Sequence, residues 1–370
     1  MRVCLIGPVP PFRGGIAKYC YSLAKALEER HELLLLSYAR QYPAILYGKK
    51  PQIDGGIDRE AVRREFRNLS FAVDSASVGS WRQTSRTIEA FRPDLVILPW
   101  WVTYWAPMYL YLLRDFRKKG IQVVVLCINV FEHEDNALKR ALTRLVLTQV
   151  DRMVVHSGKE KEQLAALNPK ATVKEHLLPL FEYHQVPQAP RAGRLNLLFF
   201  GFVRPYKGLD TLLQALALLK GRDLHLTVAG EFWKDKDDYL QLIERLGIAG
   251  RVEMVDRYVS EEEMTGYFSA ADLVVLPYKR SITSGVIATA YGYGKPVLAT
   301  RVGGFHEVVQ DGVTGKLVPP DDPQALADGI LWFLENQGID FAGNIDRFTA
   351  SKMSWPSLVD LIETLTRPRA

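Results

Sequence analysis

Residues 196–216 read NLLFFGFVRPYKGLDTLLQAL and contain one complete strand–turn–helix pattern. An apolar run ends at Gly201, and an apolar pattern with helical spacing starts at Gly208. A buried strand, a glycine turn and an amphipathic helix form the repeating unit of α/β proteins. Arg204 and Lys207 lie in the turn. Two cations beside the unpaired N–H groups of a helix start suit a diphosphate, and a plain pair of surface cations is the alternative.

The same pattern recurs along most of the chain. Short apolar runs alternate with amphipathic segments, which predicts parallel sheets with helices on both faces. The runs that predict strands lie at 2–6, 32–37, 94–98, 121–127, 152–156, 174–178, 196–201, 224–230, 251–255, 273–278 and 296–300. The segments that predict helices lie at 16–30, 137–150, 209–220, 236–246, 260–270, 285–293 and 353–366.

Length and a break in this pattern predict two domains. The chain has 370 residues, which is long for one core. Residues 183–194 contain two prolines and a glycine without apolar periodicity, so we expect an interdomain linker there. The expected fold class is α/β, with Rossmann-like, doubly wound domains at 1–185 and 186–350 that face each other across a cleft. A helix at 351–370 would pack back on the first domain. Open α/β sheets bind ligands at the carboxyl ends of their strands.

Composition and charge narrow the class of protein. The three cysteines, Cys4, Cys20 and Cys127, lie in apolar or helical contexts, so we expect reduced, buried thiols and a cytoplasmic chain. No run approaches the roughly 18 uninterrupted apolar residues of a membrane span, and residues 1–12 lack a signal-peptide core. The net charge is +5, with the positive excess in the first half. This suits an anionic partner such as phosphate groups or lipid headgroups, and a solvated basic face is the alternative. Neither paired Cys/His ligands nor an aromatic RNA-binding signature is present, so we expect no nucleic-acid partner.

The loop after the first predicted strand, residues 7–19, reads GPVPPFRGGIAKY. Gly14 and Gly15 open a helix there. Paired glycines let a backbone approach a ligand closely, and a helix N-terminus favours anions; a plain tight turn is the alternative. The dinucleotide fingerprint GxGxxG is absent, which counts against a nicotinamide enzyme.

These motifs, in this order, resemble the retaining glycosyltransferases of family 4 (group 1), which have the GT-B fold. The run GxxRPYKGxD at 201–210 is similar to the phosphate-binding loop of that family, and PPFRGGIAKY at 10–19 is similar to its acceptor-side glycine loop. Residues 257–278 look like its nucleotide-base loop, helix and strand, and residues 294–330 look like its ending. The resemblance covers nearly the whole chain and is most specific in the second half.

The resemblance implies a metal-independent, retaining hexosyltransferase without a cofactor. Its co-substrate would be a UDP- or GDP-linked sugar, and its acceptor a glycan or a lipid-linked molecule in polysaccharide or glycoconjugate biosynthesis. Arg204 and Lys207 would bind the diphosphate and offset charge on the leaving group. Donor binding would also involve the pairs Gly14 and Gly15, near the N-terminus, and Tyr258 and Val259, which would meet the base. A sugar-nucleotide epimerase and a non-catalytic nucleotide- or glycan-binding partner subunit are the alternatives.

The chain departs from the family at two glutamates. Members usually carry them with seven residues between the two, and here Ser281 and Thr289 occupy the two positions. Backbone N–H groups at a helix start would hold the diphosphate instead, contributed by Ser284, Gly285 and Val286. Thr289 would offer a hydroxyl towards the ribose, and an inactive relative is the alternative.

A histidine that the family often places after the strand at 121–127 is also missing, and Ile128 occupies its position. His133, with Asn129 and Glu132 nearby, is the closest replacement. A neutral imidazole there would hydrogen-bond a sugar hydroxyl as part of the catalytic site, and a histidine in a surface loop is the alternative.

Aromatic residues follow the predicted strand at 94–98. Trp100, Trp101 and Tyr104 would stack on sugar rings or contact a lipid acceptor, and core packing is the alternative. We assign Arg13 to the same acceptor side.

The predicted helix at 137–150 carries Lys139, Arg140 and Arg144 beside an apolar stripe. An ordinary amphipathic surface helix is the favoured interpretation. The alternative is peripheral contact of this basic half with the inner face of an anionic membrane.

Overall fold

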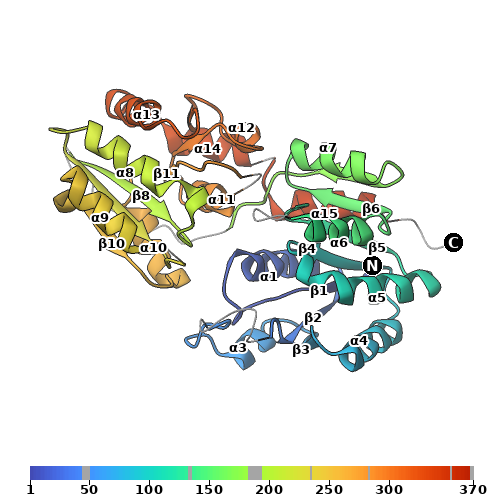
Figure 1. Ribbon diagram of the computed structural model, residues 1–370. Coiled ribbons are helices and arrows are strands. Elements are labelled where there is room, and N and C mark those ends of the chain that lie inside the picture. Colours follow the sequence, from blue (N-terminus) through green and yellow to red (C-terminus); the bar gives the residue numbers. More distant parts are fainter. Residues whose placement is uncertain are drawn as a thin grey trace. The chain divides into compact units, whose positions relative to one another are not determined.

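The computed structural model divides into two compact units, which Figure 1 shows along the chain from blue to red. The first unit comprises Met1–Leu177 and Met353–Ala370, and the second comprises Leu178–Lys352. The structure describes residues 1–43, 51–131, 136–181, 194–233, 236–281, 284–350 and 352–366. The predicted linker at 183–194 lies almost wholly outside these residues.

The first unit is built on a seven-stranded parallel sheet with the strand order β3-β2-β1-β4-β5-β6-β7. Its strands are β1 (Arg2–Ile6), β2 (Glu32–Arg40), β3 (Leu69–Asp74), β4 (Leu95–Trp100), β5 (Val123–Cys127), β6 (Arg152–Val155) and β7 (Thr172–Glu175). Its helices are α1 (Gly15–Glu28), α3 (Arg59–Arg64), α4 (Val78–Phe91), the 3-10 turn η1 (Thr103–Trp105), α5 (Ala106–Lys118), α6 (Ala137–Leu147), α7 (Gly158–Leu167) and α15 (Trp355–Thr364).

The second unit is built on a six-stranded parallel sheet with the order β10-β9-β8-β11-β12-β13. Its strands are β8 (Leu195–Phe200), β9 (Leu224–Ala229), β10 (Val252–Val255), β11 (Leu273–Leu276), β12 (Val297–Thr300) and β13 (Gly315–Val318). Its helices are η2 (Pro205–Lys207), α8 (Leu209–Leu218), α9 (Lys236–Leu246), η3 (Ala249–Arg251), α10 (Glu261–Ala270), α11 (Gly285–Gly292), α12 (Phe305–Val308), α13 (Pro323–Glu335) and α14 (Phe341–Thr349).

Both sheets start from a central strand and grow first to one side and then to the other. This order confirms the predicted doubly wound α/β architecture. Strands β4 and β11 are buried along their whole length because helices cover both faces of each sheet. In the second unit α8, α9 and α13 share one core with the sheet, to which they contribute Leu212, Leu216, Ile243, Ile330 and Phe333.

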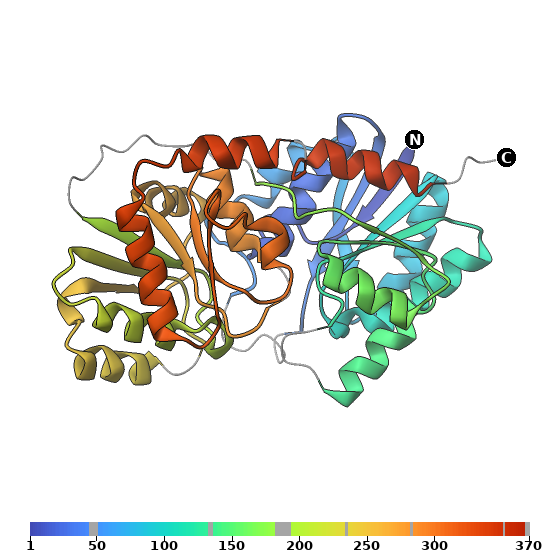
Figure 2. The same cartoon turned by 90° about the horizontal axis from the view of Figure 1, so that it is seen from above.

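The last helix, α15, packs against α1 within the first unit, where Figure 2 shows it in red. The rings of Trp355 and Tyr19 meet edge to face with their centroids 5.2 Å apart. At the other end of α1, Arg30 forms ion pairs with Asp360 and Glu363. Aromatic packing and charge pairing therefore hold α15 against α1 and the residues that follow it.

The structure corrects some predicted strands. β7 is Thr172–Glu175, so the predicted strand at 174–178 was wrong in its limits, and β3 and β13 were not predicted. The three cysteines are buried and free, as predicted. Within the part of the chain that the structure describes, no helix has both the length and the apolar character needed to cross a membrane.

Candidate functional site

Two loops meet at the carboxyl edge of the second sheet: the β8 loop (residues 201–208) and the β11 loop (residues 277–281). Strands β8 and β11 are neighbours at the point where the strand order reverses. Open α/β sheets bind ligands outside the carboxyl ends of strands at this point. The backbone N–H of Lys279 donates a hydrogen bond to the carbonyl of Tyr206 at 2.8 Å, which joins the two loops.

Glycines permit this close contact. Gly208 has a φ of +70°, and a Cβ there would lie 2.0 Å from the carbonyl oxygen of Pro277. Gly201 has a φ of +93°, and a Cβ there would lie 3.0 Å from Nζ of Lys207. Any other residue at position 208 would strain the backbone and push the two loops apart.

Lys207 lies buried beneath the β8 loop, with 7% of its surface exposed. Its Nζ donates a hydrogen bond to the carbonyl of Phe200 at 3.3 Å and lies 5.4 Å from the ring centroid of Tyr278. Burial, reinforced by the charge of Arg204, lowers the pKa of Lys207 to about 7. An ammonium group can donate three hydrogen bonds, and burying it costs free energy unless an anion pairs with it. The site therefore favours an anionic ligand beside Lys207.

Arg204 lies over an aromatic side chain that the sequence analysis missed. The guanidinium carbon of Arg204 is 4.3 Å from the ring centroid of Trp233, in the loop that follows β9. The sequence contained one indication of this contact: Trp233 is an aromatic residue shortly after the predicted strand at 224–230. Lys279 was also missed; its Nζ forms ion pairs with Asp210 at 2.7 Å and Asp321 at 3.3 Å.

The first turn of α11 adjoins the β8 loop. A Cβ at Gly201 would lie 4.0 Å from a side-chain methyl of Val286, so Gly201 adjoins both Val286 and Lys207. Ser284 caps the helix, and its hydroxyl accepts a hydrogen bond from the N–H of Val286 at 3.2 Å. Gly285 is exposed. The structure thus brings Lys207 together with the predicted helix start, where the N–H groups of the first turn favour an anion.

Ser281 and Thr289, at the positions of the missing glutamates, are each 7% exposed. The hydroxyl of Thr289 donates a hydrogen bond to the carbonyl of Gly285 at 2.9 Å, inside its own helix. A contact between Thr289 and a ribose hydroxyl would therefore use the threonine oxygen as the acceptor.

Tyr258 and Val259 follow β10, two strands away from β8. Tyr258 is half-buried and Val259 is 9% exposed. Ser260 and Glu263 form a reciprocal capping box that fixes the start of α10. Arg257 pairs with Glu263 at 2.6 Å and donates a hydrogen bond to the carbonyl of Tyr258 at 3.3 Å, so this loop has a defined conformation.

The predicted glycine loop of the first unit has an open helix start. Gly14 precedes α1 with a φ of +102°, and apart from the adjoining backbone no atom of the described residues lies within 4 Å of a Cβ built at Gly14 or Gly15. The backbone N–H of Arg13 donates to the carbonyl of Gln52 at 3.0 Å, and its Nη1 donates to the carbonyl of Pro51 at 3.1 Å. Arg13 therefore ties this loop to residues 51–52.

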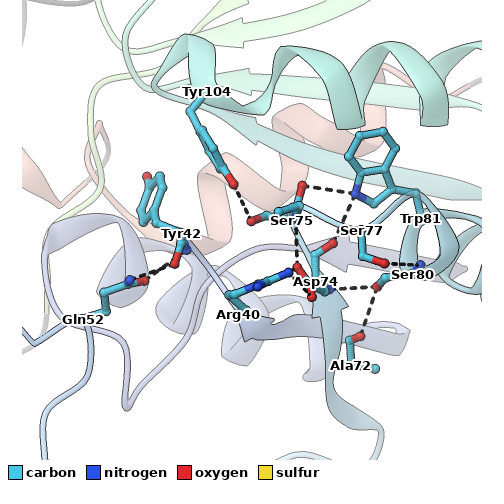
Figure 3. A network of polar contacts seen from close by, with 11 residues as sticks. Arg40, Tyr42, Gln52, Ala72, Asp74, Ser75, Ser77, Ser80, Trp81 and Tyr104 are labelled. Atoms are coloured by element: carbon cyan, nitrogen blue, oxygen red, sulfur yellow. Dashed lines mark hydrogen bonds and ion pairs between the residues drawn. The ribbon is translucent and has the colours of Figure 1, made fainter. Parts of the chain in front are cut away.

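The predicted aromatic residues of the acceptor side differ in exposure. Trp100 and Trp101 are 1% and 7% exposed, and Nε1 of Trp101 donates to the hydroxyl of Tyr42 at 3.1 Å. Their burial favours the core-packing alternative for both. Tyr104 is half-buried, and its hydroxyl is 2.8 Å from that of Ser75 (Figure 3).

A polar network that the sequence analysis did not single out lies beside Tyr104, at the carboxyl ends of β2 and β3. Figure 3 shows Arg40 on Asp74, where Nε and Nη2 donate to the two carboxylate oxygens at 2.9 and 2.6 Å. The indole N–H of Trp81 donates to the Asp74 carbonyl at 3.2 Å. These contacts give the edge of the first sheet a fixed shape next to Tyr104.

His133 lies outside the described residues, as do all of residues 132–135. The loop that leads to them is anchored by Glu160, which is fully buried in the first turn of α7. One carboxylate oxygen of Glu160 accepts a hydrogen bond from the N–H of Val130 at 3.2 Å, and Trp100 donates to the Val130 carbonyl at 3.4 Å.

The structure is a two-unit α/β protein with a buried lysine, Lys207, at the carboxyl edge of its second sheet. Two protein families match the chain: "Glycosyl transferase 4-like domain" at residues 14–180 and "Glycosyl transferases group 1" at residues 194–336. Together the two matches cover most of the chain. The chain belongs to the group 1 family of glycosyltransferases.

Curated relatives match about half of the chain. D-inositol 3-phosphate glycosyltransferase 1 of Catenulispora acidiphila is 35% identical over 52% of this chain and 50% of its own length. D-inositol 3-phosphate glycosyltransferase of Mycolicibacterium gilvum is 30% identical over 59% of this chain and 52% of its own length. The chain thus spans about half the length of the curated relatives it matches.

Solved structures match over nearly the whole length. HepE of Anabaena in complex with UDP has a TM-score of 0.77, with 18% identity and 99% of each chain covered. Sucrose-phosphate synthase of Thermosynechococcus elongatus has a TM-score of 0.75, with 18% identity and 98% of each chain covered. These similarities confirm the predicted GT-B fold.

Proposed function

We propose that this chain is a retaining hexosyltransferase that moves a sugar from a nucleoside diphosphate sugar to a glycan or lipid-linked acceptor. The observation that carries the proposal is the burial of Lys207 next to the first turn of α11, with Arg204 in the same loop. Membership of the glycosyltransferase family supports this reading of the anion site.

The charges of this site fit the bond that must break. As the sugar leaves, negative charge develops on the departing diphosphate. Cations that are partly removed from water stabilise this charge more strongly than they would in bulk water, and here Lys207 is buried and Arg204 is half-buried. In this proposal Lys207 and Arg204 perform that role, and the backbone at Ser284–Val286 holds the phosphate oxygens. The departing diphosphate is itself a base near the acceptor hydroxyl, so the proposed reaction needs neither a protein nucleophile nor a metal ion.

We propose a UDP- or GDP-linked donor, with its base near Tyr258 and Val259. The solved structure of Anabaena HepE with UDP-glucose has the same fold and supports a nucleotide-sugar donor for this chain. We place the acceptor on the first unit, near Tyr104, where a half-buried phenol is available.

The test is transfer of labelled sugar by the purified chain. UDP-, GDP- and ADP-linked hexoses are incubated with glycan and lipid-linked acceptors, and we expect one donor to give a retained glycosidic linkage. Conversion of the donor without an acceptor would assign the epimerase alternative instead. Binding of a nucleotide without turnover with any acceptor would assign the non-catalytic partner subunit.

Peripheral contact with an anionic lipid surface is part of the proposal for a lipid-linked acceptor. Helix α6 supports it, because Leu138 and Leu145 are 69% and 49% exposed on a helix whose outer side also carries Arg140 and Arg144. Exposed leucines beside arginines suit the boundary between acyl chains and anionic headgroups.

Vesicle sedimentation tests this contact. We expect binding to vesicles with phosphatidylglycerol but not to vesicles of phosphatidylcholine alone, and loss of binding in a Leu138→Ser, Leu145→Ser variant. The control variant changes two exposed leucines of the second unit, Leu218→Ser and Leu240→Ser. Equal binding by both variants would argue against α6 as the contact.

A further inference from the structure

Trp233 is a large apolar side chain in an exposed position. It lies in the β9 loop (residues 230–233), and 39% of its surface is exposed. A tryptophan that remains this exposed gains only part of the free energy that full burial would give. Packing in the core therefore does not explain why a tryptophan lies at this position, beside the β8 loop.

The indole ring carries the guanidinium group of Arg204. The guanidinium carbon lies 4.3 Å from the ring centroid, well within the distance of about 6 Å over which a cation is attracted to an aromatic face. The planar guanidinium of arginine also stacks on aromatic rings, which an ammonium group cannot do.

The backbone fixes both members of this pair. Val203 and Phe232 form a parallel bridge, which continues the β8–β9 pairing beyond the ends of the two strands. The N–H of Val203 donates to the carbonyl of Glu231 at 2.9 Å. Arg204 and Trp233 each come one residue after the bridged pair, so the same register sets them side by side.

Two further contacts hold the β9 loop. The N–H of Phe232 donates to a carboxylate oxygen of Asp256 at 2.9 Å, which ties the loop to the end of β10. The ring of Phe202 meets that of Trp233 edge to face, with centroids 5.6 Å apart. The indole thus has support from the backbone and from a second aromatic ring.

We propose that Trp233 is a positioning residue that holds the Arg204 guanidinium ready for the diphosphate of the donor. This inference rests on the proposed function of the β8 loop. A free arginine side chain loses rotamer freedom when it binds an anion, and a guanidinium already seated on a ring loses less. Stacking on the indole ring also fixes the plane of the guanidinium group, and bidentate contact with phosphate oxygens requires such a fixed orientation.

The test measures binding of phosphate groups and of nucleosides separately. The probes are UDP, GDP, ADP, inorganic pyrophosphate and the nucleosides uridine, guanosine and adenosine. We expect Trp233→Leu to weaken binding of pyrophosphate and of the preferred nucleoside diphosphate about two- to fivefold, the ratio that corresponds to an exposed cation–π pair. Binding of the nucleoside should not change, and Trp233→Phe, which keeps a ring, should recover most of the loss.

A double-mutant cycle separates positioning from other roles. In an Arg204→Ala background, Trp233→Leu should cause no further loss, because the residue on which Trp233 acts is gone. The matched control is Trp332→Leu, which removes a second cation–π pair in the same unit, with Lys316 at 4.9 Å. This control should leave pyrophosphate binding unchanged.

Each other outcome overturns the inference. An equal loss of nucleoside and diphosphate binding would assign Trp233 to stacking on the base. An undiminished loss in the Arg204→Ala background would show that Trp233 acts independently of Arg204. Unchanged binding of pyrophosphate and nucleoside diphosphate in Trp233→Leu would show that Trp233 does not position Arg204, and it would not contradict the proposed function. Absence of binding of any nucleoside diphosphate to the unmodified protein would overturn the proposed function as well.

Discussion

The ammonium nitrogen of Lys207 lies 3.3 Å from the carbonyl oxygen of Phe200, the last residue of β8. The lysine thus reaches back beneath its own loop and places its charge at the carboxyl end of the strand. Gly201 leaves room for it, since a Cβ at this position would lie 3.0 Å from the ammonium nitrogen. The amino group of Lys207 is therefore held in place before any ligand arrives.

Replacement of this cation should remove activity without loss of the fold. We expect Lys207→Met to lower kcat about 10²–10³-fold, the usual effect of removing a group that stabilises developing negative charge, and Arg204→Ala to lower it similarly. The unfolding temperature of Lys207→Met should not fall, because methionine avoids the desolvation cost of the buried ammonium. Lys220→Met, at an exposed lysine, is the control. Near-normal turnover in both site variants would rule out the pair.

Nucleoside diphosphate binding should weaken as the pH rises from neutral. Burial and Arg204 lower the pKa of Lys207 to about 7, so the free protein loses this charge above pH 7. A bound diphosphate favours the charged form and raises the pKa of Lys207, so binding takes up a proton in that range. Affinity should be highest below pH 7 and fall up to tenfold per pH unit above it. Calorimetry from pH 6 to 9 measures this, and Lys207→Met should abolish the trend.

The sequence predicts central strands better than edge strands. β4 and β11 are buried on both faces and therefore appear as continuous apolar runs. β3, β7 and β13 lie at the edges of the sheets, and these are the strands that were missed or misplaced. Three of the four residues of β7 are exposed, so apolar periodicity carries little information there. β10 is also an edge strand, but it was predicted because Val252, Met254 and Val255 form an apolar pattern that only Glu253 interrupts.

Within the site, the sequence predicts residues that share one loop and misses those that meet only in space. Arg204 and Lys207 belong to a single strand–turn–helix unit, so local spacing is enough to find them. Trp233 and Lys279 reach the same loop because β9 and β11 flank β8, and this order is a tertiary property that no local pattern encodes.

Stability should fall as the pH drops below the ordinary range of histidine. Complete burial lowers the pKa of His156 to about 4, from 6.5. Its two ring nitrogens contact the hydroxyl of Tyr19 at 3.0 Å and the carbonyl of His176 at 2.8 Å. Between pH 6.5 and 4 the unfolded chain binds more protons at His156 than the folded chain does. The contribution of the neutral, buried imidazole to the free energy of unfolding is therefore complete above pH 6.5 and is lost as the pH falls towards 4. It amounts to roughly 3 kcal/mol at most.

Unfolding temperatures between pH 4 and 8 measure this effect. His156→Gln keeps hydrogen-bonding groups but does not titrate, so its unfolding temperature should depend less on pH in this window. His306→Gln changes an exposed histidine and should retain the dependence of the unmodified protein. Parallel curves for His156→Gln and the unmodified protein would contradict the assignment.

Gly208→Ala should damage both the fold and the site, whereas Gly221→Ala should damage the fold only slightly. Both glycines have a positive φ, +70° and +83°. An alanine at either position costs about 1 kcal/mol in backbone strain. At Gly221 no atom of the part of the chain that the structure describes, apart from the chain neighbours, lies within 4 Å of the new Cβ, but at Gly208 the new Cβ would lie 2.0 Å from the carbonyl oxygen of Pro277. That contact cannot be relieved by rotation of a side chain, so the β8 and β11 loops must separate.

We therefore expect Gly208→Ala to lower the unfolding temperature more than Gly221→Ala does, and to weaken nucleoside diphosphate binding as well. Equal falls in unfolding temperature and equal affinities in the two variants would show that the close contact of the loops does not shape the site.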